Sequence, residues 1–254
     1  MDHEELRSKY RREFVAADYS DTIVAHSFLR YFYHRELHSI FESLPDRKRS
    51  LLDVGCGPTT YNVFPATKSV QDVVLSDFLP GNRVAVEKWL QNAPDAFDGS
   101  CYSEHLAKLE GFSDIKRGSE EITARTRSAV RKVVPCDVLI PGVLPEEHRE
   151  KFDVVLSCLC LESACNDEAA FRRATQNVGD LVHDRGLLIL CGVLGSPEYT
   201  VGRVKFPTVY LTPDLVKDAV VRAGFQIKLW RCLEGPDRLT ATIKSAFVVA
   251  AEKL

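Results

Sequence analysis

The stretch LLDVGCGPTTYN, residues 51–62, joins an apolar run to two glycines that stand one residue apart. The run is apolar on successive residues, which is typical of a strand buried on both faces. Gly55 and Gly57 then allow the backbone to turn sharply and to pass close to a ligand. Because ligands of open α/β sheets bind at the carboxyl ends of the strands, this turn is a candidate binding site.

Similar apolar runs alternate with amphipathic stretches along most of the chain. The runs predict strands over residues 50–55, 72–78, 151–161, 186–194, 226–234 and 245–254. The amphipathic stretches predict helices over residues 81–92, 119–134 and 167–184, and residues 198–211 resemble a hairpin. Thr212 and Pro213 favour the start of a last helix, which Gly224 would end. The alternation predicts an α/β fold with a doubly wound, parallel sheet.

The chain shows no internal repeat and no linker, so residues 1–254 are expected to form one domain. An aromatic-rich helical cap is expected over residues 1–45, and the sheet core over residues 46–254. Residues 94–118 are expected to form an irregular insertion in that core. Additional segments of this kind often cover a ligand.

Composition narrows the classes of partner. The net charge is −3 and basic residues do not gather in long tracts, which gives no electrostatic reason to expect nucleic acid or a membrane surface. The N-terminal stretch is charged, and no run of about 18 apolar residues occurs. The eight cysteines are interpreted as free thiols of a cytoplasmic protein. The absence of a heptad pattern favours a monomer.

The turn after the first predicted strand does not fit a phosphate. A dinucleotide fingerprint would place a third glycine where Thr60 stands, and Pro58 removes one amide donor. The Lys-Ser/Thr pair of a phosphate-binding loop is also missing. Asp77, twenty residues after Gly57, could accept hydrogen bonds from two ribose hydroxyls. A nucleoside without phosphates is therefore the predicted ligand.

Several motifs together resemble one family. LLDVGCGPTTYNV, VVLSDFLPGN, EKWLQNAPDAFD, LSCLCLESACND and KFPTVYL are similar to motifs of the small-molecule methyltransferases that use S-adenosylmethionine. That family includes the nicotinamide, phenylethanolamine and indolethylamine N-methyltransferases. The resemblance implies a Rossmann-like class I methyltransferase sheet with an N-terminal helical cap, S-adenosylmethionine as cofactor, and a small amine or heterocycle as substrate.

The resemblance also implies a set of cofactor-binding residues. Tyr19 and Tyr61 would bind the methionine carboxylate, and Asp137 with Val138 would bind adenine. Cys158 stands where the family often has threonine near the methionine amine. The full set is Tyr19, Gly55, Cys56, Gly57, Tyr61, Asp77, Asn82, Asp137, Val138 and Cys158.

The substrate pocket is placed in the same way. Nicotinamide enzymes carry an aspartate at the position of Gly192, so that acid is missing here. Glu162 and Glu198 are nearby acids that could attract a cationic amine, although Glu198 also fits a solvated surface position. The implied pocket residues are Tyr10, Phe14, Leu159, Gly192, Tyr199 and Thr208. Ordinary core packing is the alternative interpretation of Tyr10, Phe14 and Tyr199.

Three functions stay open at this point. The first is N-methylation of a small amine or aromatic heterocycle, the second is S-methylation of a thioether or selenoether, and the third is silent cofactor binding. The sulfonium is already activated, so orientation and a dry site are expected to suffice without a catalytic side chain. No metal is expected, because Cys158, Cys160 and Cys165 lack a second ligand pair at zinc spacing.

Overall fold

The computed structural model describes residues 2–25, 27–46, 48–234 and 243–254. The strands are β1 (Lys48–Val54), β2 (Val70–Asp77), β3 (Val130–Pro135), β4 (Phe152–Cys158), β5 (Val182–Leu194), β6 (Glu198–Val201), β7 (Val204–Pro207), β8 (Phe225–Glu234) and β9 (Ser245–Lys253). The helices are α1 (His3–Glu13), α2 (Ala16–Ala25), α3 (Ser27–Glu42), α4 (Pro80–Leu90), α5 (Ser100–Leu109), α6 (Ile115–Ala129), α7 (Leu161–Ala164), α8 (Glu168–Gly179) and α9 (Pro213–Arg222). Two 3-10 helices, η1 (Tyr61–Lys68) and η2 (Glu146–His148), complete the set.

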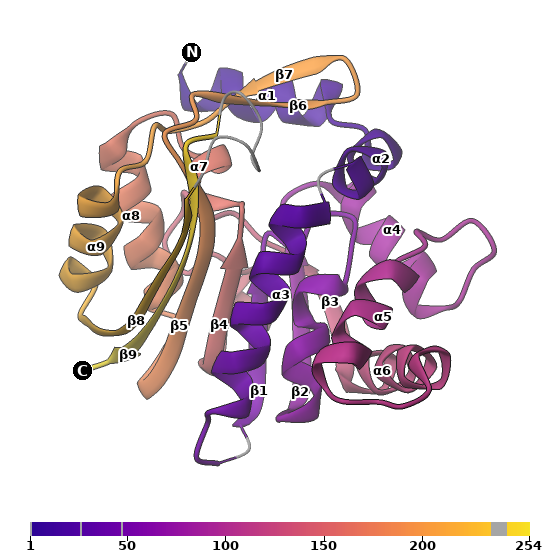
Figure 1. Ribbon diagram of the computed structural model, residues 1–254. Coiled ribbons are helices and arrows are strands. Elements are labelled where there is room, and N and C mark those ends of the chain that lie inside the picture. Colours follow the sequence, from indigo (N-terminus) through magenta and orange to yellow (C-terminus); the bar gives the residue numbers. More distant parts are fainter. Residues whose placement is uncertain (1, 26, 47, 235–242) are drawn as a thin grey trace.

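The centre of the molecule is a seven-stranded sheet with the order β3-β2-β1-β4-β5-β9-β8 (Figure 1). β1 pairs in parallel with both β2 and β4, so the strand order reverses direction between β1 and β4. β9 inserts between β5 and β8 and is antiparallel to both. The predicted doubly wound α/β sheet is confirmed, but the prediction that it is parallel throughout was wrong, because β9 runs antiparallel to β5 and β8. The switch point lies at the end of β1, where such sheets bind ligands.

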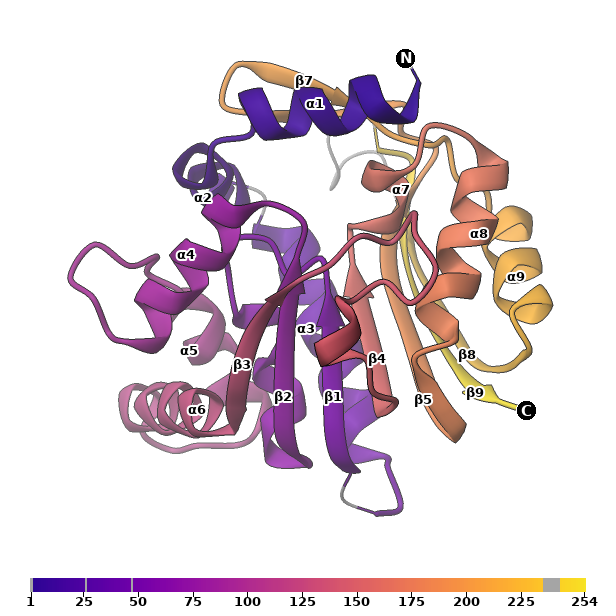
Figure 2. The same ribbon diagram turned by 180° about the vertical axis from the view of Figure 1, so that it is seen from behind.

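Strand residues alternate between two hydrophobic cores. Leu51 and Val154 belong to the core under α3, whereas Leu52 and Val155 belong to the core under α8 and α9. Figures 1 and 2 show α3 on one face of the sheet and the α8–α9 pair beyond the other. Because both faces are covered, successive strand residues must be apolar, which explains the unbroken runs in the sequence.

The middle of the chain differs from the sequence prediction. Residues 94–118 are largely helical rather than irregular, because α5 packs against α6 and forms a third core with η1. The helix expected over residues 119–134 ends at Ala129, and β3 follows it. β3 lies at the edge of the sheet and carries Arg131 and Lys132, so its pattern resembled an amphipathic helix.

Two element boundaries also differ. The strand expected over residues 151–161 ends at Cys158, because Leu159 adopts a left-handed conformation with φ of 56° and breaks it. α8 ends at Gly179 and β5 already begins at Val182, before the predicted start of that strand.

The cap lies at the carboxyl edge of the parallel strands. α1 and the β6–β7 hairpin lie side by side across this edge, with α2 next to them (Figures 1 and 2). α3, which the sequence placed in the cap, instead packs along the sheet. Within the described residues, no helix has the length and apolar character needed to cross a membrane.

Candidate cofactor and substrate site

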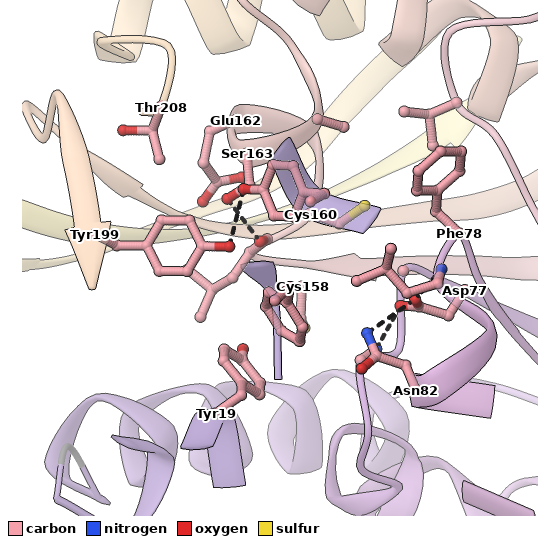
Figure 3. A pocket seen from close by; sticks show the side chains of 18 of the residues that line it. Tyr19, Asp77, Phe78, Asn82, Cys158, Cys160, Glu162, Ser163, Tyr199 and Thr208 are labelled. Atoms are coloured by element: carbon pink, nitrogen blue, oxygen red, sulfur yellow. Dashed lines mark hydrogen bonds between the residues drawn. The ribbon is translucent and has the colours of Figure 1, made fainter. Parts of the chain in front are cut away.

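A cavity of about 330 Å³ opens at the carboxyl ends of the parallel strands, beneath the cap. This is the size of a small-molecule site. Figure 3 shows Tyr199, Thr208 and Glu162 on one side of it and Asp77 and Asn82 on the other. The sequence-predicted residues that line it are Tyr10, Phe14, Tyr19, Gly55, Cys56, Gly57, Asp77, Asn82, Asp137, Val138, Cys158, Leu159, Glu162, Glu198, Tyr199 and Thr208.

The glycine turn forms one wall. Gly55 and Gly57 have φ angles of +74° and +66°, which side chains rarely adopt. A Cβ at Gly55 would collide with the thiol of Cys160, and one at Gly57 would lie 3.5 Å from the ring of Tyr19. Both positions therefore require glycine, and the turn leaves its backbone next to the cavity.

Asp77 is fixed at the end of β2. One carboxylate oxygen accepts hydrogen bonds from the Leu79 amide at 2.8 Å and from Asn82 Nδ2 at 2.9 Å. The other accepts from the Gly57 amide at 2.8 Å, so Asp77 connects the ends of β1 and β2. Burial raises the pKa of this carboxyl above its ordinary value. The first oxygen has both lone pairs in use, whereas the second can accept one further hydrogen bond, which suits a hydroxyl group of a ligand.

Asp137 lies just beyond the end of β3 and contacts the cap. One of its carboxylate oxygens forms an ion pair with Arg7 of α1, and the other accepts from the Leu139 amide at 3.1 Å. The Arg7 guanidinium also lies 5.5 Å from the centre of the Phe78 ring. α1 is thereby attached to the end of the cavity where the resemblance places adenine. No motif identified Arg7 or Phe78.

The opposite end has aromatic walls from α1 and the hairpin. The hydroxyls of Tyr10 and Tyr199 lie 2.9 Å apart, and the Tyr10 ring stacks on Phe206 with centroids 4.7 Å apart. The Phe14 and Tyr19 rings pack at 5.3 Å and continue this wall. Tyr10, Phe14, Tyr19 and Tyr199 line the cavity, whereas Phe206 is fully buried behind Tyr10.

Glu162 is a buried acid at this aromatic end. It belongs to α7, its side chain is 3% exposed, and one carboxylate oxygen accepts from the Val193 amide at 3.2 Å. Burial raises the pKa of Glu162 to about 7. Glu198, the other candidate acid, is paired with Lys205 and is about one-third exposed.

Thr208, another predicted pocket residue, lies at the same end of the cavity. Its hydroxyl donates a hydrogen bond to the Ser196 carbonyl at 2.7 Å.

Two predicted site residues do not line the cavity. Tyr61 is buried behind the wall, where its ring stacks on Tyr102 with centroids 4.4 Å apart. A Cβ at Gly192 would lie 2.7 Å from the Phe247 ring and 3.0 Å from a Glu162 carboxylate oxygen. An aspartate at Gly192 therefore has no room, and the carboxylate of Glu162 lies next to the place it would take.

Thiols also line the cavity. Cys136 and Cys160 join the expected Cys56 and Cys158 in the wall. Burial raises the pKa of the Cys136 thiol to about 12 and also raises the pKa of the other three. All four are therefore protonated, weakly polar groups at neutral pH.

Comparison with known proteins assigns the family. The model of the NNMT/PNMT/TEMT family matches residues 4–254 of the chain. The chain belongs to this family. Human nicotinamide N-methyltransferase is 34% identical over 205 residues, which cover 80% of this chain and 76% of that protein. Mouse indolethylamine N-methyltransferase is 31% identical over 231 residues, which cover 88% and 86%. The chain is therefore an S-adenosylmethionine-dependent methyltransferase.

Solved structures share the fold of this methyltransferase at low sequence identity. Magnesium protoporphyrin IX methyltransferase from Synechocystis PCC 6803 with bound SAH aligns with a TM-score of 0.60 at 12% identity over 100% of both chains. The N-methyltransferase NodS from Bradyrhizobium japonicum WM9 with S-adenosylhomocysteine aligns with a TM-score of 0.58 at 12% identity, over 99% of this chain and 97% of NodS.

Proposed function

We propose that this methyltransferase transfers a methyl group from S-adenosylmethionine to the nitrogen of a small amine or aromatic heterocycle. The observation that carries the substrate class is the buried carboxylate of Glu162 in an aromatic pocket. A cationic amine gains from a buried carboxylate and from the faces of aromatic rings. The relatives of the chain include nicotinamide, phenylethanolamine and indolethylamine N-methyltransferases, which support the same substrate class.

The cavity also fits the cofactor. The open backbone at Gly55 and Gly57 would receive the thioether and ribose region, and the free acceptor position of Asp77 suits a ribose hydroxyl. Asp137 and Val138 would contact adenine from the neighbouring strand end. The cofactor supplies a methyl group that is already activated by its sulfonium.

The chain's own contribution is then binding, orientation and exclusion of water. Tyr10 and Tyr199 connect α1 to the hairpin beside the pocket, and this contact would help to keep water from the substrate end. Glu162 would hold the amine in one orientation relative to the cofactor. Orientation of this kind can lower a barrier by ~7–11 kcal/mol, so no side chain needs to act as nucleophile. The bound ammonium would give one proton to the Glu162 carboxylate, whose pKa burial raises to about 7, and the freed nitrogen lone pair would then take the methyl group as the thioether leaves.

A methyl-transfer panel tests the substrate class. Labelled S-adenosylmethionine is incubated with nicotinamide, tryptamine, phenylethanolamine or dimethyl sulfide, using the wild type, Glu162→Gln and Glu198→Gln. We expect the cationic amines to be methylated best, with a large loss in Glu162→Gln and a small one in Glu198→Gln, whose carboxylate is already paired. Preferred methylation of dimethyl sulfide, insensitive to Glu162→Gln, would instead establish thioether S-methylation. Cofactor binding without any methylated product would establish that the protein binds S-adenosylmethionine without catalysing methyl transfer.

We also propose that the protein works as a monomer in the cytoplasm. No disulfide links the eight cysteines in the described part of the chain, which fits a reducing compartment. Light scattering coupled to size exclusion tests the oligomeric state, and a mass of about twice 28.5 kDa would contradict it.

A further inference from the structure

Arg30 is a buried cation in the wall of the cavity. It belongs to α3, is 6% exposed, and lines the cavity next to Leu29 and Tyr19. Its Nη2 atom donates a hydrogen bond to the Tyr19 hydroxyl at 3.1 Å, while its buried Nε has no partner. Among the described residues, no carboxylate forms an ion pair with it. Because an uncompensated buried charge is strongly unfavourable, this guanidinium requires an anion that the described residues do not provide.

The groups around Arg30 do not supply that anion. The guanidinium lies 5.6 Å from the centre of the Tyr61 ring. Burial lowers the pKa of neighbouring His34 to about 3, so this side chain is neutral. Glu162 is close enough for Arg30 to lower its pKa slightly against the larger effect of burial, yet the two groups form no ion pair.

The distribution of charge in the cavity indicates which ligand group reaches Arg30. Two guanidiniums line the cavity, and Arg7 is already paired with Asp137 at the end expected to hold adenine. Arg30 is unpaired and lies beside Tyr19, whose ring faces Gly57 of the glycine turn. The acids Asp77 and Asp137 suit the neutral nucleoside, and the one anionic group of S-adenosylmethionine is its carboxylate.

We propose that Arg30 forms an ion pair with the carboxylate of the cofactor's methionyl group, with the Tyr19 hydroxyl as its neighbour in that contact. This inference rests on the proposed use of the cavity by S-adenosylmethionine and adds a residue that no sequence motif identified. It assigns to Tyr61 a supporting position beneath the guanidinium, in place of the direct contact implied by the family resemblance.

Binding of two matched ligands tests the ion pair. One is S-adenosylhomocysteine, and the other is its decarboxylated analogue, which keeps the adenosine, the thioether and the amine. Calorimetry on the wild type should show a clear preference for S-adenosylhomocysteine. Arg30→Gln should weaken S-adenosylhomocysteine by roughly 10- to 150-fold, the usual range for a hydrogen bond to a charged group. Arg30→Gln should change the affinity for the decarboxylated analogue by less than about twofold. Arg30→Lys should restore part of the preference for S-adenosylhomocysteine.

The other outcomes are distinguishable. Equal weakening of both ligands, or an unchanged preference in Arg30→Gln, overturns the ion pair. Undiminished S-adenosylhomocysteine binding, combined with weaker binding of a carboxylate-bearing acceptor, assigns Arg30 to the substrate and also overturns it. If the wild type binds neither ligand, the proposed use of the cavity by S-adenosylmethionine is refuted, and this result does not depend on the Arg30 variants.

Folding is controlled with the melting temperature of the unliganded protein. Because Arg30 has no acid partner, an uncharged replacement should leave the melting temperature unchanged or raise it. Arg30→Met is the second variant if glutamine is not tolerated, and the same loss of preference is expected. Arg125→Gln is the matched control, since Arg125 is a half-buried arginine paired with Glu110 away from the cavity. It should lower the melting temperature and leave the ligand preference intact.

Discussion

Asp53 should make the stability of this methyltransferase fall as the pH rises. The residue lies in β1, is fully buried, and neither carboxylate oxygen has a hydrogen-bond partner among the described residues. Burial, followed by the charge of Asp77, raises the pKa of Asp53 from 3.8 to about 8. The folded chain therefore keeps this carboxyl protonated at neutral pH, whereas the unfolded chain ionises it.

The sign and size of the effect follow from this difference. The folded state binds one proton more than the unfolded state between about pH 4 and pH 8, so the free energy of unfolding falls across that interval. The slope is about 1.4 kcal/mol per pH unit, which gives roughly 3 kcal/mol between about pH 5 and pH 7. Asp53→Asn removes the ionisable group and keeps the shape of the side chain. The free energy of unfolding of the variant, relative to the wild type, should therefore rise by that amount over the same pH interval.

Urea denaturation of both proteins at about pH 5, 6, 7 and 8 measures the difference directly. Subtracting the two curves removes the contribution of other titrating groups, Glu162 included. Asp72→Asn, in the neighbouring strand β2, repeats the same carboxyl-to-amide change at a partly exposed position and measures the effect of that change itself. If the Asp53→Asn and wild-type curves are parallel, Asp53 does not hold a proton in the folded state.

Three further predictions concern the cavity and its walls. Asp77→Ala should weaken the binding of S-adenosylhomocysteine by ~1–3 kcal/mol in calorimetry, because a ribose hydroxyl would lose its acceptor, and unchanged affinity would remove Asp77 from the site. Binding of tryptamine, which stays cationic, should tighten between about pH 6 and pH 8 as Glu162 ionises, and a titration of Glu162→Gln should be flat. Gly192→Ala should lower the free energy of unfolding by ~1–3 kcal/mol, since its Cβ would lie 2.7 Å from the Phe247 ring, and an unchanged urea midpoint would contradict this close packing.

The sequence predicted the inner strands well because their burial leaves a clear signal. β1, β2, β4 and β5 are covered on both faces, so their residues are apolar without interruption. β3 was missed because an edge strand tolerates charged residues such as Arg131 and Lys132. The end of β4 was placed too late because the left-handed backbone at Leu159 has no signature in the residue type.

The candidate site was predictable to a similar degree. Residues inside motifs, such as Gly55, Gly57 and Asp77, line the cavity together because the ends of neighbouring parallel strands meet there. Arg7 and Arg30 were missed, since each lies on an amphipathic helix where an arginine ordinarily faces solvent. Their position depends on how α1 and α3 pack against the sheet, which local sequence patterns do not encode.

A crystal structure with S-adenosylhomocysteine and tryptamine is the most direct test of the account. We expect a ribose hydroxyl within hydrogen-bond distance of Asp77 and the amine of tryptamine against the carboxylate of Glu162. An amine bound at Glu198, or an adenosine bound away from the glycine turn, would contradict it.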